Sequence, residues 1–287
     1  MENRLNDVLA LTPLTDEGKI VLKQAMNLQK LVPYRIFAVN IIPAVSLFLR
    51  LFGPPKTQRL KEENALKRLT GFLTGFYGGK IPENVIPLVL SGNLVRTLIK
   101  QAQSGDFYFM VLKRSKHKNG IPNVLKKSEL NKVIAHSFSP VLLVNEDSSS
   151  ENLENILVPL DISENTEKKL LWASLFAKKA KAKIQIVSAL NLNIDKYKSQ
   201  TTKNAGAIKE MLLKRGIESE IEILKANNKD KTEAVLHFME TKRTDIVIIR
   251  KHQVASVTNT TIGDFAKEII NRSKAPVFIV SQSHGDI

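Results

Sequence analysis

The chain has 287 residues, of which 43% are hydrophobic and 25% are charged. This composition is that of a folded globular protein and excludes an intrinsically disordered one, and the length suits about two domains of ~150 residues. Cysteine is absent, which excludes disulfides, thiol catalysis and thiolate metal sites and fits a reducing compartment.

The net charge of +15 raises nucleic acid or an anionic membrane surface as a partner. The sequence shows no recognition helix, aromatic RNA-binding stripe or zinc-finger spacing, so we do not expect nucleic acid as the main partner. The first residues, MENRLND, lack a signal-peptide pattern. The most apolar stretch, residues 41–52, contains Pro43 and Arg50 and is too short to span a bilayer. We expect a cytoplasmic protein without a transmembrane segment.

The first half of the chain alternates short apolar runs with amphipathic segments, which predicts strands alternating with helices. Gly71 and Gly75 could interrupt the second helix. Residues 45–55 (VSLFLRLFGPP) form an apolar patch that either packs in the core or contacts a partner, a second copy or a small apolar ligand. The predicted strands are 6–11, 36–42, 85–90, 107–112 and 141–144, and the predicted helices are 16–31, 60–77, 93–103 and 128–136.

The same order recurs after an acidic and serine-rich linker at residues 146–152. The predicted strands are 156–161, 184–190, 217–224, 246–249 and 277–280, and the first three helices are 166–181, 203–215 and 232–241. After the fourth strand we expect a long loop, then a fourth helix that begins near Gly263 and Asp264, with Asp264 placed to cap its N-terminus.

Two matches indicate a duplication. SPVLLV at 139–144 resembles APVFIV at 275–280, and VLALTPLTDEGKIVL resembles ILVPLDISENTEKKL. The sequence therefore predicts an α/β protein with two doubly wound parallel-sheet domains, at residues 1–146 and 153–287.

Residues 156–190 and 244–280 resemble the universal stress protein family, and the duplication resembles its tandem members. The resemblance implies a five-stranded parallel sheet in each domain, of the adenine nucleotide alpha hydrolase-like type. It also implies that the two domains pair through their last strands, here Val141–Val144 and Val277–Val280. The chain would then form its own pseudo-dimer.

Nucleotide-binding members of this family carry the pattern G-x2-G-x9-G-[S/T] after the fourth strand, where glycines bring backbone N–H groups to the phosphates. The resemblance places Arg250 and Gln253 at the first two glycines. It keeps Gly263 and puts Asp264 at the hydroxyl position. Side chains would then fill the space of the phosphates, and the Asp264 carboxylate would repel an anion. Asp161 matches the family's acidic residue near the nucleotide base.

The first half departs further from this pattern. Pro13 stands where the second half has its acidic residue, and Lys127 with Ser128 stands where it has the last glycine and its neighbour. The loop before them is basic, and we expect either a solvated loop or an anion site made of side chains. Its basic residues are Lys113, Arg114, Lys116, His117 and Lys118.

Other catalytic patterns are absent from the sequence. The five histidines show no metal-ligand spacing, and there is no G-x-S-x-G elbow, Walker loop or dinucleotide fingerprint. Trp172 is expected in the core rather than as a ligand platform.

We therefore expect a non-enzymatic stress-response protein without a cofactor, acting through an unknown protein partner or another ligand. Two alternatives remain. One is a stress sensor that binds ATP or AMP through a modified phosphate loop, and the other is a basic module for nucleic acid or membrane surfaces.

Overall fold

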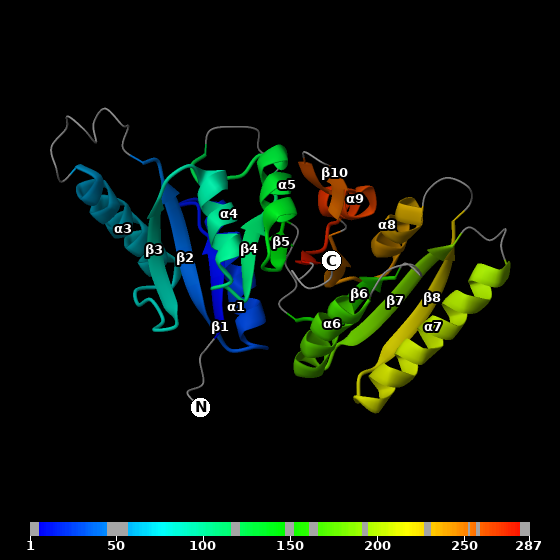
Figure 1. The fold of residues 1–287 in the computed structure, drawn as a ribbon. Coiled ribbons are helices and arrows are strands. Elements are labelled where there is room, and N and C mark those ends of the chain that lie inside the picture. Colours follow the sequence, from blue (N-terminus) through cyan, green and yellow to red (C-terminus); the bar gives the residue numbers. More distant parts are fainter. Residues whose placement is uncertain are drawn as a thin grey trace. The chain divides into compact units, whose positions relative to one another are not determined.

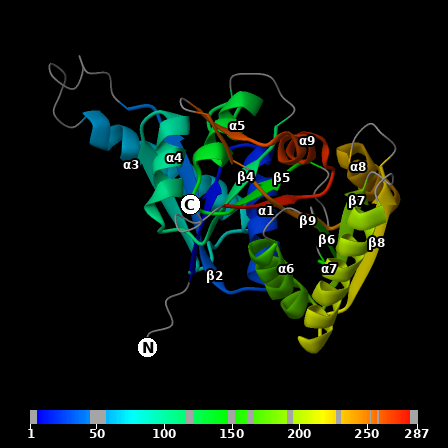
Figure 2. The same ribbon diagram turned by 45° about the vertical axis from the view of Figure 1, so that its right-hand side comes forward.

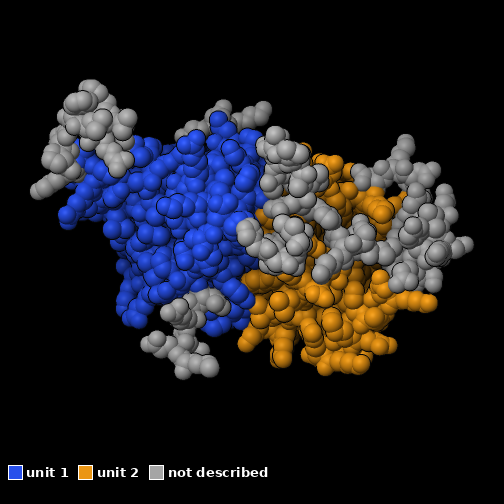
Figure 3. All heavy atoms as spheres, viewed as in Figure 1, with its two compact units in different colours: residues 1–145 blue, residues 146–287 orange. Residues whose placement is uncertain are grey.

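The computed structural model describes residues 6–44, 57–115, 121–146, 152–160, 166–190, 195–226, 231–251, 253–256 and 259–281. The chain divides into two compact units, unit 1 (residues 1–145) and unit 2 (residues 146–287), coloured blue and orange in Figure 3. The apolar stretch at residues 45–55 lies outside the described residues, so both of its expected roles stay predictions.

Unit 1 alternates strands and helices from its first strand to its last (Figure 1). The elements are β1 (Asn6–Leu11), α1 (Asp16–Gln29), β2 (Tyr34–Ile42), α3 (Thr57–Phe76), β3 (Val85–Ser91), α4 (Leu94–Ser104), β4 (Phe109–Lys113), α5 (Lys127–His136) and β5 (Val141–Val144). The strands lie in the order β3-β2-β1-β4-β5, and every pair is parallel. Val8 in the central strand is aligned with Ile36 on one side and Phe109 on the other.

The strand order decides which helices cover which face. From β1 the chain steps outward to β2 and β3 through α1 and α3, and it then steps in the opposite direction to β4 and β5 through α4 and α5. Because parallel crossovers are right-handed, the two pairs of helices cover opposite faces of the sheet. Figure 1 shows α4 and α5 side by side, and they contact each other.

Unit 2 repeats this arrangement. Its elements are β6 (Asn155–Pro159), α6 (Glu167–Ala180), β7 (Lys183–Leu190), α7 (Asp195–Lys214), β8 (Ser219–Lys225), α8 (Lys231–Thr241), β9 (Ile246–Arg250), β10 (Gln253–Ser256), β11 (Asn259–Ile262), α9 (Asp264–Arg272) and β12 (Val277–Val280). The main sheet has the order β12-β9-β6-β7-β8 with parallel pairs throughout. In Figure 2, α6 and α7 lie on one side of these strands and α8 and α9 on the other. The predicted pair of doubly wound parallel sheets is confirmed.

Two predicted helices differ from the structure. α3 runs without a break through Gly71 and Gly75, so the expected interruption is wrong. It is held by one buried stripe of Ala65, Leu69 and Leu73, and the side of the helix at Gly71 has room around it. α7 begins at Asp195 rather than at residue 203, because its first two turns are polar and lack the apolar period used for the prediction.

The core of each unit consists of strands buried on both faces, as in β4, β5 and β12, where every residue is buried. Trp172 on α6 is partly buried. Its ring centroid lies 4.7 Å from that of Phe278 in β12 and 5.6 Å from that of Phe176. Trp172 therefore packs against the core, at its border rather than inside it.

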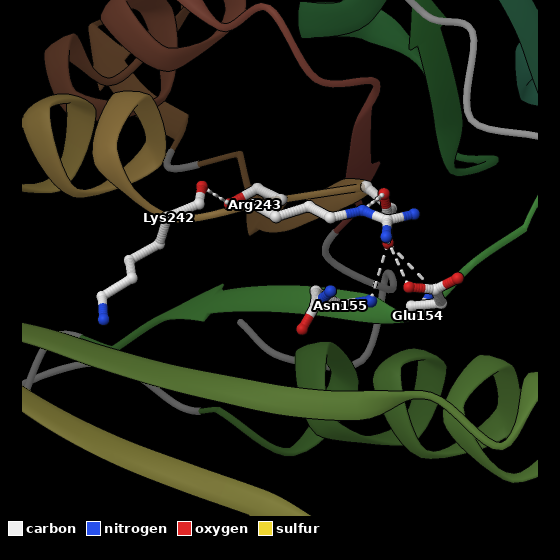
Figure 4. Close-up of polar contacts among 6 residues, drawn as sticks. Glu154, Asn155, Lys242 and Arg243 are labelled. Carbon is white, nitrogen blue, oxygen red and sulfur yellow. Dashed lines mark hydrogen bonds and ion pairs between the residues drawn. The ribbon is translucent and has the colours of Figure 1, made fainter.

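At the amino ends of β6 and β9, Asp245 joins the two strands. Figure 4 shows Glu154, Asn155 and Arg243 gathered at this place. The backbone N–H groups of Glu154 and Asn155 donate to its Oδ2 at 2.9 and 2.8 Å. Arg243 Nε donates to Oδ1 at 3.1 Å, and Arg243 Nη1 donates to Glu154 Oε2 at 2.5 Å. Because the Asp245 side chain is only 4% exposed, its carboxylate is the buried acceptor that holds the start of β6.

Replacing this acceptor should weaken unit 2. We expect Asp245→Ala to lower the free energy of unfolding by about 3 kcal/mol, because two backbone N–H groups lose a charged acceptor. Denaturant unfolding followed by far-UV circular dichroism measures the change. Glu154→Ala is the matched control. That carboxylate is 53% exposed, so its loss should cost less than about 1 kcal/mol. Equal effects of the two variants would contradict the assignment.

Candidate functional site

The carboxyl ends of the two central strands form the candidate site in each unit. These strands are β1 and β4 in unit 1, and β6 and β9 in unit 2. In each pair the strands are neighbours, and the chain leaves them toward opposite faces of the sheet. Ligands of open α/β sheets bind in the crevice at such a switch point. The loops after β1, β4, β6 and β9 therefore carry the residues that matter.

In unit 2 the predicted residues lie along the path from β9 to α9. Arg250 is the last residue of β9, is partly buried, and is aligned with Val280 in β12. Gln253 is the first residue of β10, and its backbone pairs with Ile262. Asp161 lies outside the described residues, so its place beside a nucleotide base stays a prediction.

The expected long loop between β9 and α9 contains a β-hairpin instead. β10 and β11 pair in antiparallel fashion, with Val254 aligned with Thr261 and Ala255 with Thr260. The sequence signal for it was weak but present, because β-branched residues gather at Val254 and at 260–262. The segment that should wrap phosphates as a glycine loop is therefore a paired ribbon.

The start of α9 is shifted by one residue from the prediction. Gly263 is the N-cap and Asp264 is the first helical residue, so the expectation that Asp264 caps the helix is wrong. Gly263 has φ −59° and ψ 150°, a conformation open to other residues, so the backbone here does not require glycine. The exposed Asp264 carboxylate lies in the first turn, where a negative charge interacts favourably with the helix dipole. It occupies the place where an anionic ligand would gain the same interaction.

Two buried lysines in unit 2 were not predicted. Lys169 on α6 is 3% exposed, and its Nζ donates to the Pro159 carbonyl at the end of β6 at 2.9 Å. Lys251 follows β9, is 1% exposed, and donates its backbone N–H to the Val280 carbonyl at 3.1 Å. Burial lowers the pKa of the Lys251 ammonium from its ordinary 10.5 to about 8. With Arg250, they bring three basic side chains to the ends of β6 and β9.

In unit 1 the corresponding edge contains a buried ion pair. Lys113, the last residue of β4, places its Nζ 2.5 Å from Glu17 Oε2 in the first turn of α1. Ser115 Oγ donates to the other carboxylate oxygen, Glu17 Oε1, at 3.1 Å. The side chains of Lys113 and Glu17 are 4% and 9% exposed. Lys113 therefore does not belong to a solvated basic loop, so that expectation is wrong at this residue, while its expected role in an anion site stays a prediction.

Arg114 is partly buried, and its backbone N–H donates to the Val144 carbonyl at 2.8 Å. Lys116, His117 and Lys118 lie outside the described residues, so their expected roles stay predictions.

The chain returning from this loop closes over the carboxyl edge of unit 1. Asn123 is buried in a left-handed conformation with φ 64°, and its Oδ1 accepts the backbone N–H of Ile41 in β2 at 2.6 Å. Asn40 Nδ2 donates to the carbonyl of Thr12, the residue after β1, at 3.0 Å. Pro13 next to it is buried. Asn40 and Asn123 thus bond backbone groups at the carboxyl ends of β1 and β2.

The helix of unit 1 that corresponds to α9 also starts one residue earlier than predicted. Lys126 is the N-cap of α5, and its backbone N–H donates to Glu129 Oε2 at 2.9 Å. Counted back from the matched strands β5 and β12, Lys127 and Ser128 stand opposite Gly263 and Asp264, as in the sequence match. Unit 1 lacks the glycine at this helix start, but Ser128 carries a hydroxyl there.

Among the described residues, no group of three or more His, Asp or Glu side chains could hold a metal ion. No helix in the described part of the chain has the length and apolar character needed to cross a membrane.

The sequence of residues 152–281 matches the model of the universal stress protein family. A universal stress protein from Archaeoglobus fulgidus DSM 4304 has a similar structure, with a TM-score of 0.72 at 22% identity over 97% of this chain and 99% of that chain. A functionally unknown protein from Pseudomonas aeruginosa PAO1 reaches a TM-score of 0.63 at 15% identity over 96% of this chain and 92% of that chain. These structures show a shared fold, and the family match confirms the expected resemblance. No curated protein matches the sequence.

Stability should depend on the charge of Lys251. Because its pKa in the folded chain is about 8 and its ordinary pKa is 10.5, the unfolded chain holds the proton more tightly. The buried ammonium therefore lowers the free energy of unfolding. This loss of stability is complete below pH 8, declines as the pH rises from 8 to 10.5, and disappears above that range. We expect Lys251→Met to be more stable than the wild type by about 3 kcal/mol at pH 7, with the difference fading toward pH 10.5.

Unfolding in denaturant at a series of pH values measures this difference. Lys267→Met, at an exposed position on α9, is the control and should show no such trend. A constant difference between Lys251→Met and the wild type across the range would show that the ammonium is not desolvated.

Proposed function

Because residues 152–281 belong to the universal stress protein family and unit 1 repeats the strand order of unit 2, we propose that the chain is a non-enzymatic tandem universal stress protein without standard ATP binding. It acts through protein contacts or through another ligand. The expected pairing of Val141–Val144 with Val277–Val280, which would make the chain its own pseudo-dimer, is part of this proposal.

One observation carries the proposal: carboxylates stand in the first turns of the helices that border both candidate sites. In unit 1 this carboxylate is Glu17 on α1, the helix after β1, and in unit 2 it is Asp264 on α9, the helix after β9 and the hairpin. A triphosphate brings several negative charges to the same places, and like charges a few Å apart disfavour each other. In unit 2 the hairpin also replaces the loop that would expose backbone N–H groups to phosphates.

The non-enzymatic part of the proposal rests on the sequence, which carries no nucleophile elbow, Walker loop or dinucleotide fingerprint. The buried polar groups at the two edges also have structural roles in the described part of the chain. Lys169 bonds the end of β6, and Asn123 bonds β2.

A second function, a stress sensor that binds ATP or AMP in a modified way, is favoured by one observation. Lys169, Arg250 and Lys251 bring positive charge to the ends of β6 and β9, where a phosphate group could bind to side chains in place of glycine N–H groups. This sensor would use unit 2. In unit 1 the residue corresponding to Arg250 is Lys113, and it is paired with Glu17.

Nucleotide titration separates the two functions. We expect ATP, ADP and AMP to leave the thermal unfolding midpoint of the wild type unchanged. A nucleotide at 100 times its dissociation constant would add about 2.7 kcal/mol of stability, which raises the midpoint by several degrees and would refute the proposal.

The variant Asp264→Ser restores the hydroxyl and removes the charge, so it should respond to ATP more strongly than the wild type. Glu268→Gln is the matched control, because it removes a carboxylate of the same helix one turn further from the start. If Asp264→Ser and Glu268→Gln respond equally, Asp264 is not what prevents binding.

A further inference from the structure

The Glu17 carboxylate is bound in unit 1 as a ligand anion would be. It lies in the first turn of α1, where the helix dipole favours negative charge. The Lys113 ammonium contacts one oxygen at 2.5 Å, and the Ser115 hydroxyl donates to the other at 3.1 Å. An ammonium, a hydroxyl and a helix N-terminus at the carboxyl edge of a parallel sheet are the groups with which proteins bind phosphate and carboxylate ligands.

The local backbone holds Glu17 in this position. A β-carbon on the next residue, Gly18, would lie 2.0 Å from the carbonyl oxygen of Pro13. Glycine therefore allows the first turn of α1 to lie directly against the loop that leaves β1. This close contact keeps the carboxylate over the end of β4 rather than in solvent.

Unit 2 has no carboxylate at the matching position. In the match of residues 8–22 with residues 156–170, Glu17 stands opposite Asn165, which lies outside the described residues. The residue corresponding to Lys113 is Arg250. The nearby Lys169 ammonium on α6 donates to the Pro159 carbonyl instead of a carboxylate.

We propose that unit 1 contains a site for a small oxyanion, a phosphate or a carboxylate, which its own Glu17 side chain fills, so that unit 1 accepts no external anion. The inference deepens the proposed function, since it states why one of the two units cannot hold a phosphate-bearing ligand. Any anion that binds the chain at a carboxyl edge then binds unit 2.

Removing the internal carboxylate tests the proposal. In Glu17→Ala the site is empty and Lys113 keeps its charge, so inorganic phosphate or formate should bind there. We expect either anion, added at constant ionic strength, to raise the thermal unfolding midpoint of Glu17→Ala by about 2–4 °C more than that of the wild type. If this variant unfolds in buffer alone, its refolding yield with and without phosphate is measured instead.

Three variants serve as controls. Asp16→Ala removes the neighbouring carboxylate of the same turn, which is 90% exposed, and should behave as the wild type. Glu17→Gln keeps the site filled and should not respond to phosphate. The double variant Glu17→Leu with Lys113→Met replaces the pair by apolar side chains, should fold, and should not respond.

Three results would overturn the proposal. They are an equal phosphate response of the wild type and Glu17→Ala, a response that survives in the double variant, and no recovery of Glu17→Ala by either anion. These outcomes are distinct from those for the proposed function. ATP binding by the wild type would refute the proposed function while leaving the Glu17 site intact, because such binding would use unit 2.

Discussion

The structure depends on the parallel pairing of two central strands in each unit, β1 with β4 and β6 with β9. β4 and β9 are apolar and almost wholly buried up to their last residues, Lys113 and Arg250, so their charged side chains stand only at the carboxyl ends. The chain leaves each pair toward opposite faces, which opens the sheet at its carboxyl ends. The polar chemistry of both units is consequently gathered in the loops and first helical turns at that edge.

Much of the fold could be predicted from the sequence because double burial leaves continuous apolar runs. β1, β5 and β12 begin and end at the predicted residues. The hairpin of β10 and β11 was missed because its four-residue strands have no glycine turn signal and no sustained alternation. The first turns of α7 were missed because they are polar.

The candidate site could be predicted only in part. The resemblance located Arg250, Gly263 and Asp264 on the path from β9 to α9, but it gave no reason to select Glu17, Lys169 or Lys251. A charged residue in an amphipathic helix is normally read as solvent-exposed. The helical period contained a signal, since Glu17 precedes Val21 by four residues and thus lies on the buried stripe of α1. Its partner Lys113 is 96 positions away, and only the folded chain shows that they meet.

The attachment of β6 by Asp245 has a consequence for the order of folding during synthesis. Asp245 lies 90 positions after Asn155 and 91 positions after Glu154. The central strands β6 and β9 therefore cannot pair until β9 has left the ribosome. Until then β6 lacks its neighbour on one side, and such non-local pairing is slow. Unit 1, whose strands all precede residue 146, can finish its sheet while unit 2 is still being made. The duplicated chain therefore folds its two copies one after the other.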